Sequence, residues 1–240
     1  MKETKERFPS GLTLKQRGAL FSSRLFHGMT EEEARFAFLA MDGILRRFRR
    51  GEYILHQGEA LSRFGLVLSG AVEVYSDDIE GNRMMMASVL AGETFGESLS
   101  YLAIPAPQVQ ILAAEDSLVL LLSAEALVGL SPVSDPKLFS LAERFSRMLA
   151  ERALAMNDRI QILSKKTIRL RLLAYFTVCR RRFGNATFAI PMSRERLAVY
   201  LGVNRSALSR ELSQMQKEGL ISYYRETVRL HYEKEIENNS

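Results

Sequence analysis

The pattern of apolar residues changes at about residue 136, and this change most constrains how the chain can fold. From residue 50 to residue 122, glycines repeatedly end short apolar stretches, which is typical of strands joined by tight turns. After residue 136, apolar residues recur at helical spacing. The 240 residues are also enough for two domains. We therefore expect an α+β protein with an all-β first part and a mainly helical second part.

The first part, residues 1–135, is predicted to be an antiparallel β domain. Residues 66–68, 71–75 and 84–90 are rich in strand-forming residues, and turn glycines separate the stretches. No long helical pattern lies between them, so a sandwich or barrel is expected, and a jelly roll fits. Ahead of the strands, residues 12–47 mix apolar and charged side chains and are expected to form short helices.

Residues 136–163 are predicted to form one long helix, which Asp135 can cap. At about 1.5 Å per residue it would be roughly 40 Å long. A small β domain would not cover that length, so we expect its apolar stripe to pack on the same stripe of a second copy in a two-fold dimer. The alternative is that the stripe packs only on its own domain. The expected interface residues are Leu141, Phe145, Leu149, Met156 and Ile160.

Residues 164–240 are predicted to contain a helix, a tight turn and a second helix, followed by a hairpin. Ser164 can cap a preceding helix that ends at Gly184 and carries Cys179 among its core positions. Residues 193–202 form the first helix of the pair, and Asn204 can cap the second. Residues 219–230 suggest a hairpin whose tip, residues 224–226, could touch phosphate through Arg225 as a wing.

The second helix of this pair, residues 205–218, has an apolar and a polar face. Its expected inner residues are leucines and a methionine, at positions 208, 212 and 215. Four polar side chains project outward from its first two turns, as a helix that reads bases in the major groove requires. They are Arg205, Ser206, Ser209 and Arg210.

Charge is distributed unevenly along the chain. Residues 1–135 hold 13 Lys and Arg against 18 Asp and Glu, whereas residues 136–240 hold 20 against 10. A basic region of this kind indicates an acidic polymer as partner, most often nucleic acid. A solvated basic face is the alternative interpretation of charge alone.

With both halves considered, the chain resembles the CRP/FNR family of bacterial transcription regulators over about residues 20–232. That family has a cyclic-nucleotide-binding-type β-roll, a long dimerisation helix and a C-terminal winged helix-turn-helix domain. The resemblance lies in residues 51–54, 58–59, 68–72 and 92–97 of the roll, and in residues 197–212 of the DNA-binding part. It implies double-stranded DNA, a second copy of the chain and RNA polymerase as partners.

The resemblance also assigns roles to single residues. It places Arg205, Ser206 and Arg210 at base-reading positions, with Ser209 between them, and Ser193 and Arg194 at phosphate-contacting positions. Well-known members carry a glutamate where this chain has Ser206, so a different DNA half-site is expected.

Residues 96–99 resemble the start of the family's phosphate-binding cassette, and Gly96, Glu97, Ser98 and Leu99 are the candidate effector residues. Glu97 could instead be a structural residue that bonds backbone in a turn. The cassette's arginine is replaced by Pro107, and no Lys or Arg occurs from residue 84 to residue 136. A cyclic phosphate would lack its counter-charge, so cAMP and cGMP are not expected. Apolar residues between 99 and 122 leave room for an apolar effector, or form an ordinary filled core.

Cofactors are not expected. The single cysteine, Cys179, excludes an internal disulfide, an iron-sulfur cluster and cysteine-rich zinc sites. His27, His56 and His231 show no metal-ligand spacing. A haem held by one histidine stays open but is not expected, because the arrangement of the haem-sensing branch is absent. The longest apolar run is too short to span a membrane and no secretory signal begins the chain, so a cytoplasmic protein without membrane contact is expected.

The leading hypothesis is a homodimeric DNA-binding regulator that acts on an inverted repeat and responds to a small molecule other than a typical cyclic nucleotide. A second hypothesis is an effector-binding module that acts through protein contacts. An enzyme is not expected, because no nucleotide-binding motif, catalytic triad spacing or metal cluster occurs in the sequence.

Overall fold

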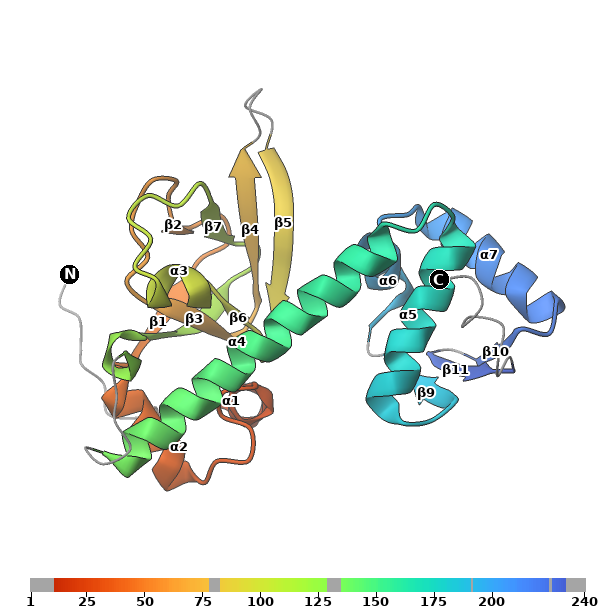
Figure 1. Cartoon of the computed structure of the whole chain (residues 1–240). Helices are drawn as coiled ribbons and strands as arrows, with labels where there is room; N and C mark the ends of the chain where they lie inside the picture. Colours follow the sequence, from red (N-terminus) through yellow and green to blue (C-terminus); the bar gives the residue numbers. More distant parts are fainter. Residues whose placement is uncertain (1–10, 78–82, 129–134, 191, 225, 232–240) are drawn as a thin grey trace. The chain divides into compact units, whose positions relative to one another are not determined.

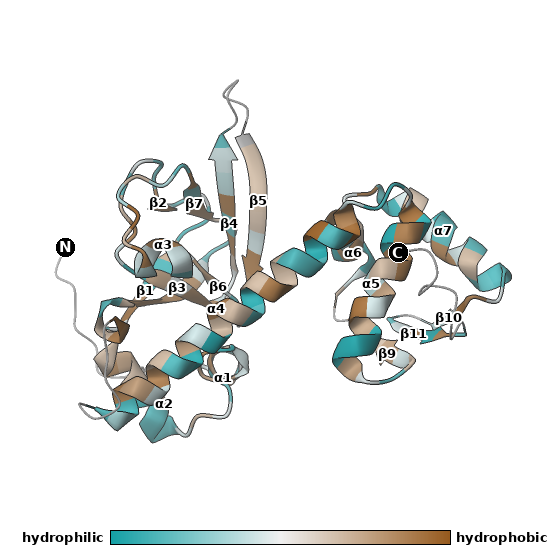
Figure 2. Cartoon of the chain, viewed as in Figure 1, coloured by the Kyte–Doolittle hydropathy of each residue, from teal (hydrophilic) through white to brown (hydrophobic). Residues whose placement is uncertain are grey.

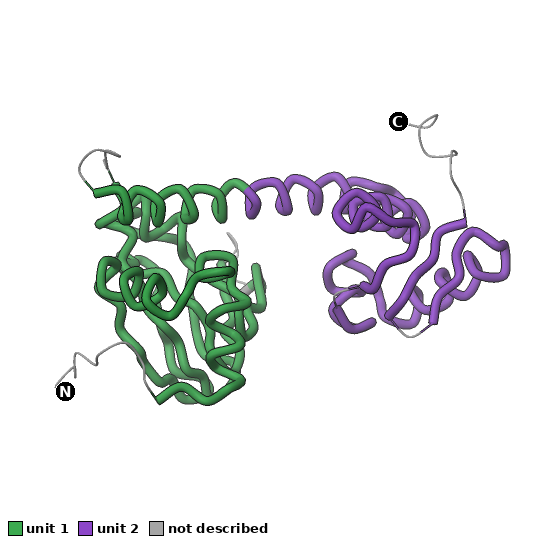
Figure 3. Tube along the Cα trace, turned by 90° about the horizontal axis from the view of Figure 1, so that it is seen from below, with its two compact units in different colours: residues 1–150 green, residues 151–240 purple. Residues whose placement is uncertain are grey.

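The computed structural model describes residues 11–77, 83–128, 135–190, 192–224 and 226–231. The chain forms two compact units, Met1–Ala150 and Glu151–Ser240. The boundary lies inside helix α4 (Pro136–Leu163), where the trace changes colour in Figure 3. The bounds of α4 are those predicted for the long helix.

Unit 1 contains two four-stranded sheets in which all pairings are antiparallel (Figure 1). The first has the order β1-β8-β3-β6 and the second the order β2-β7-β4-β5. This confirms the predicted antiparallel β domain. The strands are β1 (Ile44–Phe48), β2 (Tyr53–Leu55), β3 (Phe64–Ser69), β4 (Ala71–Asp77), β5 (Arg83–Leu90), β6 (Thr94–Phe95), β7 (Gln110–Ala113) and β8 (Ser117–Leu122).

The two sheets share an apolar core made of Phe48, Val67, Phe95 and Val119 from the first sheet and of Val72, Val89 and Ile111 from the second. The fit is close at Gly65, where a Cβ atom would lie 2.1 Å from the ring of Phe95. No larger residue than glycine fits there without displacing that ring.

Helices cover the other face of the first sheet. They are α1 (Leu14–Ser22), α2 (Glu31–Ala40) and the first half of α4. Both α1 and α2 begin with a capping box, in which Thr13 pairs with Gln16 and Thr30 with Glu33. The expected short helices in residues 12–47 are therefore present, although the last part of this range is strand β1. Because β3 and β8 are covered on both faces, they are apolar at almost every position.

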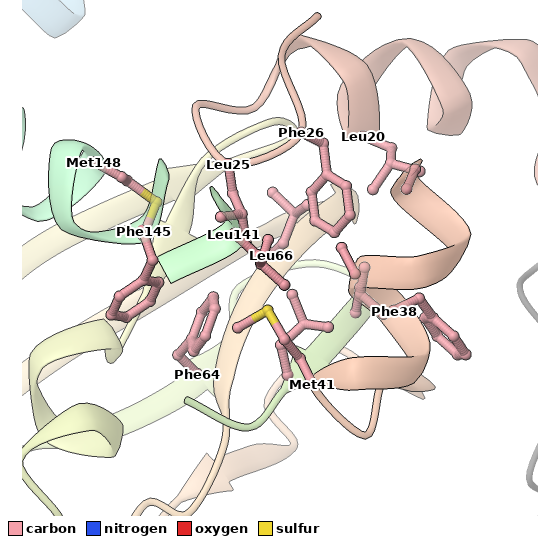
Figure 4. Close-up of a cluster of buried hydrophobic side chains, with 14 of the residues drawn as sticks. Leu20, Leu25, Phe26, Phe38, Met41, Phe64, Leu66, Leu141, Phe145 and Met148 are labelled. Atoms are coloured by element: carbon pink, nitrogen blue, oxygen red, sulfur yellow. The ribbon is translucent and has the colours of Figure 1, made fainter. Parts of the chain in front are cut away.

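The first half of α4 belongs to this helix-covered core (Figure 4). Leu141 and Phe145 are only 3% and 1% exposed, and the Phe145 ring lies 5.4 Å from that of Phe64 on β3. The prediction that Leu141 and Phe145 form a dimer interface is therefore wrong, because their own domain already buries them. Leu149 is half-buried against the same core. Further along the helix, Met156 and Ile160 are 60% and 65% exposed.

Unit 2 packs the second part of α4, through Ile162, and three further helices against a small antiparallel sheet of order β10-β11-β9. Its core includes Leu172, Phe176, Leu208, Leu212 and Val228. The elements are α5 (Ile168–Phe183), β9 (Thr187–Ala189), α6 (Arg194–Tyr200), α7 (Arg205–Lys217), β10 (Ile221–Tyr224) and β11 (Thr227–Leu230).

Helix α5 begins later than expected. Thr167 caps it by accepting a hydrogen bond from the Leu170 backbone N–H, whereas the Ser164 hydroxyl donates to the Gln161 carbonyl of α4. The predicted cap at Ser164 is therefore wrong. The helix ends as predicted at Gly184, which has a φ of 65°.

Polar and apolar segments alternate along α4 and α5 (Figure 2). Among the described residues, no helix is both long enough and apolar enough to cross a lipid bilayer.

Candidate nucleic-acid interface

Helices α6 and α7 form the predicted helix-turn-helix. Gly202, with a φ of 61°, lies in the turn between them, and the Val203 N–H donates to the Ala198 carbonyl. A left-handed conformation of this kind favours glycine. The turn therefore has the sharp geometry that places one helix across the end of the other.

Helix α7 has the two faces predicted for it. Leu208, Leu212 and Met215 are fully buried in the core of unit 2. The four polar residues Arg205, Ser206, Ser209 and Arg210 are all exposed. The structure thus brings the four predicted base-reading residues together on a solvent-facing surface at the N-terminal end of α7.

The first turn of α7 is fixed by Asn204. Its side-chain Oδ1 accepts hydrogen bonds from the Ser206 N–H at 3.0 Å and from the Ser206 hydroxyl at 2.8 Å. Because the hydroxyl donates its only proton to Asn204, the Ser206 Oγ presents lone pairs to the outside. In this state Ser206 accepts a hydrogen bond and does not donate one.

The start of α6 carries the two predicted phosphate contacts. The exposed Ser193 caps the helix by accepting from the Arg196 N–H at 3.3 Å. The guanidinium of Arg194 lies 4.9 Å from the ring centroid of Tyr223 on β10, so the ring supports this cation. The third predicted phosphate contact, Arg225, lies outside the described residues.

Two arginines of α5 hold this assembly, and the sequence patterns gave no sign of either. Arg171 donates through Nη1 to the carbonyls of Leu201 and Gly202, at 2.9 and 3.2 Å, and so supports the turn. Arg169 binds Glu211 on α7 at 2.6 Å and Glu218 at 2.7 and 3.0 Å. These hydrogen bonds from Arg169 hold the pKa of the Glu218 carboxyl below its usual value. Arg169 thus fixes α7 from the side opposite its exposed residues, whereas Arg171 fixes the turn that precedes α7.

The cassette in unit 1 is compact. Gly96 has a φ of 77°, and a Cβ atom there would lie 2.3 Å from the Leu61 side chain. Glu97 is buried, and one of its carboxylate oxygens accepts a hydrogen bond from the Thr94 hydroxyl. Leu99 packs on the core between the sheets, whereas Ser98 is exposed. The carboxylate of Glu97 thus has a partner within the protein.

Pro107, which takes the place of the cassette's arginine, is buried, and its carbonyl accepts from the Gly58 N–H at 3.1 Å. Most of residues 111–122 are buried in the two cores of unit 1. The apolar residues that suggested an effector pocket here mainly form packed core.

Cys179 lies in the core of unit 2, as expected, and burial raises the pKa of its thiol. The described residues contain no group of three His, Cys, Asp or Glu side chains placed to hold a metal ion.

Two family sequence models match the chain. The cyclic nucleotide-binding domain matches residues 45–131, and the Crp-like helix-turn-helix domain matches residues 170–238. Among curated proteins, Electron transport regulator A of Shewanella oneidensis is 29% identical over 189 residues, which are 75% of this chain and 73% of that protein. The Fumarate and nitrate reduction regulatory protein of Yersinia pestis is 27% identical over 191 residues, 76% and 74% of the two chains.

Solved structures show the same fold. FixK2 from Bradyrhizobium japonicum aligns with a TM-score of 0.50 and 24% identity, over 82% of this chain and 96% of that one. A cysteine-to-serine variant of CprK in complex with OCPA aligns with a TM-score of 0.55 and 15% identity, over 87% of this chain and 94% of that one. With a helix-turn-helix whose outward face is polar, a β-roll ahead of it, and both family models in the same order, the chain belongs to the CRP/FNR family of DNA-binding transcription regulators.

Proposed function

We propose that this regulator binds an inverted-repeat DNA site as a homodimer and reads each half-site with α7. The observation that carries the proposal is the group of four exposed polar residues in the first two turns of α7, a helix whose apolar residues Leu208, Leu212 and Met215 are buried. Arginine side chains at this place can bind guanine O6 and N7 bidentately. Ser206, with its proton given to Asn204, can accept from a base amino group.

The proposed dimer joins two copies along the exposed part of the α4 stripe. Met156 and Ile160 lie within about 20° of Leu149 around the helix, at 100° per residue. They are large apolar side chains that are more than half exposed on one helix face. Two recognition helices related by a two-fold axis would then enter successive major grooves, roughly 34 Å apart.

We further propose that the protein acts in the cytoplasm on double-stranded DNA, with RNA polymerase as its other partner, and that it needs neither catalytic chemistry nor a metal or haem cofactor. The competing function is an effector-binding module that acts through protein contacts. The two functions predict different effects of replacing the exposed arginines, because only a DNA-binding regulator depends on Arg205 and Arg210 for binding to a duplex.

Replacing Arg210 by alanine should weaken binding to the selected operator by about 1–3 kcal/mol, roughly 5- to 150-fold, and relax base preference. Replacing Arg194 should weaken binding evenly on all DNA sequences. It should also make the plot of log binding constant against log salt concentration less steep, by about one unit of slope. Fluorescence anisotropy on operator and scrambled duplexes at several salt concentrations measures both effects. Arg180→Ala is the matched control, because Arg180 is exposed in the last turn of α5 and not on α7. Unchanged operator binding by the Arg210 variant would favour the protein-contact function.

The proposed effector is not a cyclic nucleotide. Glu97 already accepts a hydrogen bond from Thr94, and the buried Pro107 offers no counter-charge for a phosphate. Calorimetric titration with cAMP and cGMP should give no saturable heat, and neither should change operator affinity. Saturable micromolar binding that is lost in Glu97→Ala would show that backbone N–H groups suffice to hold the phosphate.

A further inference from the structure

A cavity of about 690 Å³ opens in unit 1 between α2 and the first turns of α4. None of the four cassette residues at positions 96–99 lines it. Its volume is in the range of sites that bind small molecules. Figure 1 shows the two helices that form its walls near the lower end of unit 1.

The inner surface of this cavity is apolar. Phe36 and Ala37 of α2 line one wall, and Leu141 of α4 lines the other. Ala37 and Leu141 are buried members of the helix-covered core, so the base of the cavity is the outer layer of that core. Leu39 also lines the cavity and is exposed. An apolar ligand body placed here would cover apolar surface that is now in contact with water.

Two of the charged lining residues, Glu33 and Arg144, have opposite charges and already have hydrogen-bond partners within the protein. Glu33 accepts from the Thr30 backbone and hydroxyl, which lowers the pKa of its carboxyl, and the nearby Arg144 lowers that pKa slightly further. Arg144 donates through Nη1 to the His27 carbonyl at 3.0 Å. Glu33 and Arg144 therefore contribute little net charge to the cavity.

The remaining charged lining residues give an excess of positive charge. They are Arg35 on α2, Lys137 on α4 and Glu32, that is, two cations and one carboxylate. In the described part of the chain, neither Arg35 nor Lys137 forms an ion pair. The Lys137 Nζ lies 5.9 Å from the Phe36 ring centroid, so one cation stands directly beside the apolar wall.

We propose that this cavity binds a small amphipathic carboxylate, whose apolar body lies on Phe36 and Leu141 and whose anionic group lies between Lys137 and Arg35. A neutral ligand would leave the two cations without a partner, and a cationic one would face repulsion. The chemistry is that of a medium-chain or aryl carboxylic acid.

The position of the cavity also suits an effector, an extension that rests on the proposed DNA-binding function. Ser140, which lines the cavity, is nine residues before Leu149, so the two lie about 180° apart around α4. A ligand therefore leaves the proposed dimer face free. It would contact α2 and α4 together and favour the arrangement of these helices that it fits better.

The test is calorimetric titration of the full-length protein, without DNA, with decanoate, decanol and decyltrimethylammonium as probes. Decanoate should bind saturably, and at least about tenfold more tightly than decanol, which corresponds to about 1.4 kcal/mol. Decyltrimethylammonium should show no saturable binding. Ser140→Trp, which fills the cavity from an exposed position, should abolish decanoate binding.

The charge requirement is tested with a matched pair. Lys137→Glu should weaken decanoate binding at least about tenfold, whereas Arg147→Glu, the same charge change at an exposed site of α4 outside the cavity, should alter it less than about twofold. Absence of saturable decanoate binding, equal binding of all three probes, or binding that Ser140→Trp leaves intact would overturn the proposal.

The effect on DNA is measured separately, as operator affinity with and without decanoate. If decanoate binds but operator affinity does not change, the site stands and its role as effector site is rejected. If the protein binds no operator at all, the proposed function is rejected. The calorimetric titration then still shows whether the cavity binds the carboxylate.

Discussion

Replacing Phe145 by alanine is expected to lower the free energy of unfolding of unit 1 by about 3–5 kcal/mol. The ring is 1% exposed and contacts Phe64 and Tyr101, at centroid distances of 5.4 and 5.5 Å. Alanine would leave a cavity between α4 and the first sheet, which the surrounding strands can close only in part.

This loss is measurable by urea denaturation followed by circular dichroism, together with amide hydrogen exchange in β3 and β8. The control is Leu154→Ala on the same helix, where Leu154 is 58% exposed and a change of no more than about 0.5 kcal/mol is expected. If Phe145→Ala instead kept full stability and dissociated a dimer, Phe145 would belong to the interface after all.

The periodicity of α4 predicted the helix and its apolar face but not what covers that face. Leu141, Phe145, Met156 and Ile160 belong to the same repeating pattern in the sequence, yet the first two are buried in unit 1 and the last two are exposed. The helical spacing of apolar residues predicts only that one face of the helix is apolar. What covers this face depends on α1, α2 and the first sheet, which are distant from α4 in the sequence. Local patterns do not contain this information.

The DNA-binding face was predictable for the opposite reason. Arg205, Ser206, Ser209 and Arg210 owe their exposure to the spacing of Leu208, Leu212 and Met215 within a single helix. The supports at Arg169 and Arg171 were missed because they join residues 42 and 30 positions apart. The helix start at Thr167 was misplaced because Ser164 and Thr167 are both capable caps, and only the course of the backbone selects between them.

The cavity between α2 and α4 could not be predicted from the sequence either. Its walls come from residues 29–39 and 136–144, which carry no recognisable ligand motif. By contrast, the missing counter-charge of the cassette was visible in the sequence, because the absence of Lys and Arg from residue 84 to residue 136 does not depend on how the segment folds.

Introducing a carboxylate at Ile160 is expected to dissociate the proposed dimer. Ile160 is 65% exposed in the single chain, so Ile160→Glu should leave the fold of the subunit intact. In a dimer seam the same carboxylate would be buried without a partner, at a cost of about 3 kcal/mol or more, which is roughly a hundredfold in the dimer dissociation constant. Light scattering and sedimentation at micromolar concentration measure the loss, and operator affinity should fall with it.

Leu154→Glu is the matched control for this substitution. Leu154 is an equally exposed apolar residue of α4, but it lies five residues after Leu149 and hence about 140° away from it around the helix. The Leu154 variant should remain dimeric. Leu149→Glu would be a less direct test, because Leu149 also packs on the core of its own subunit, so loss of the dimer could follow from loss of the fold. An unchanged dimer in Ile160→Glu would contradict the seam, because a seam at this position would bury two carboxylates without partners. A monomeric wild type would contradict the proposed dimer itself.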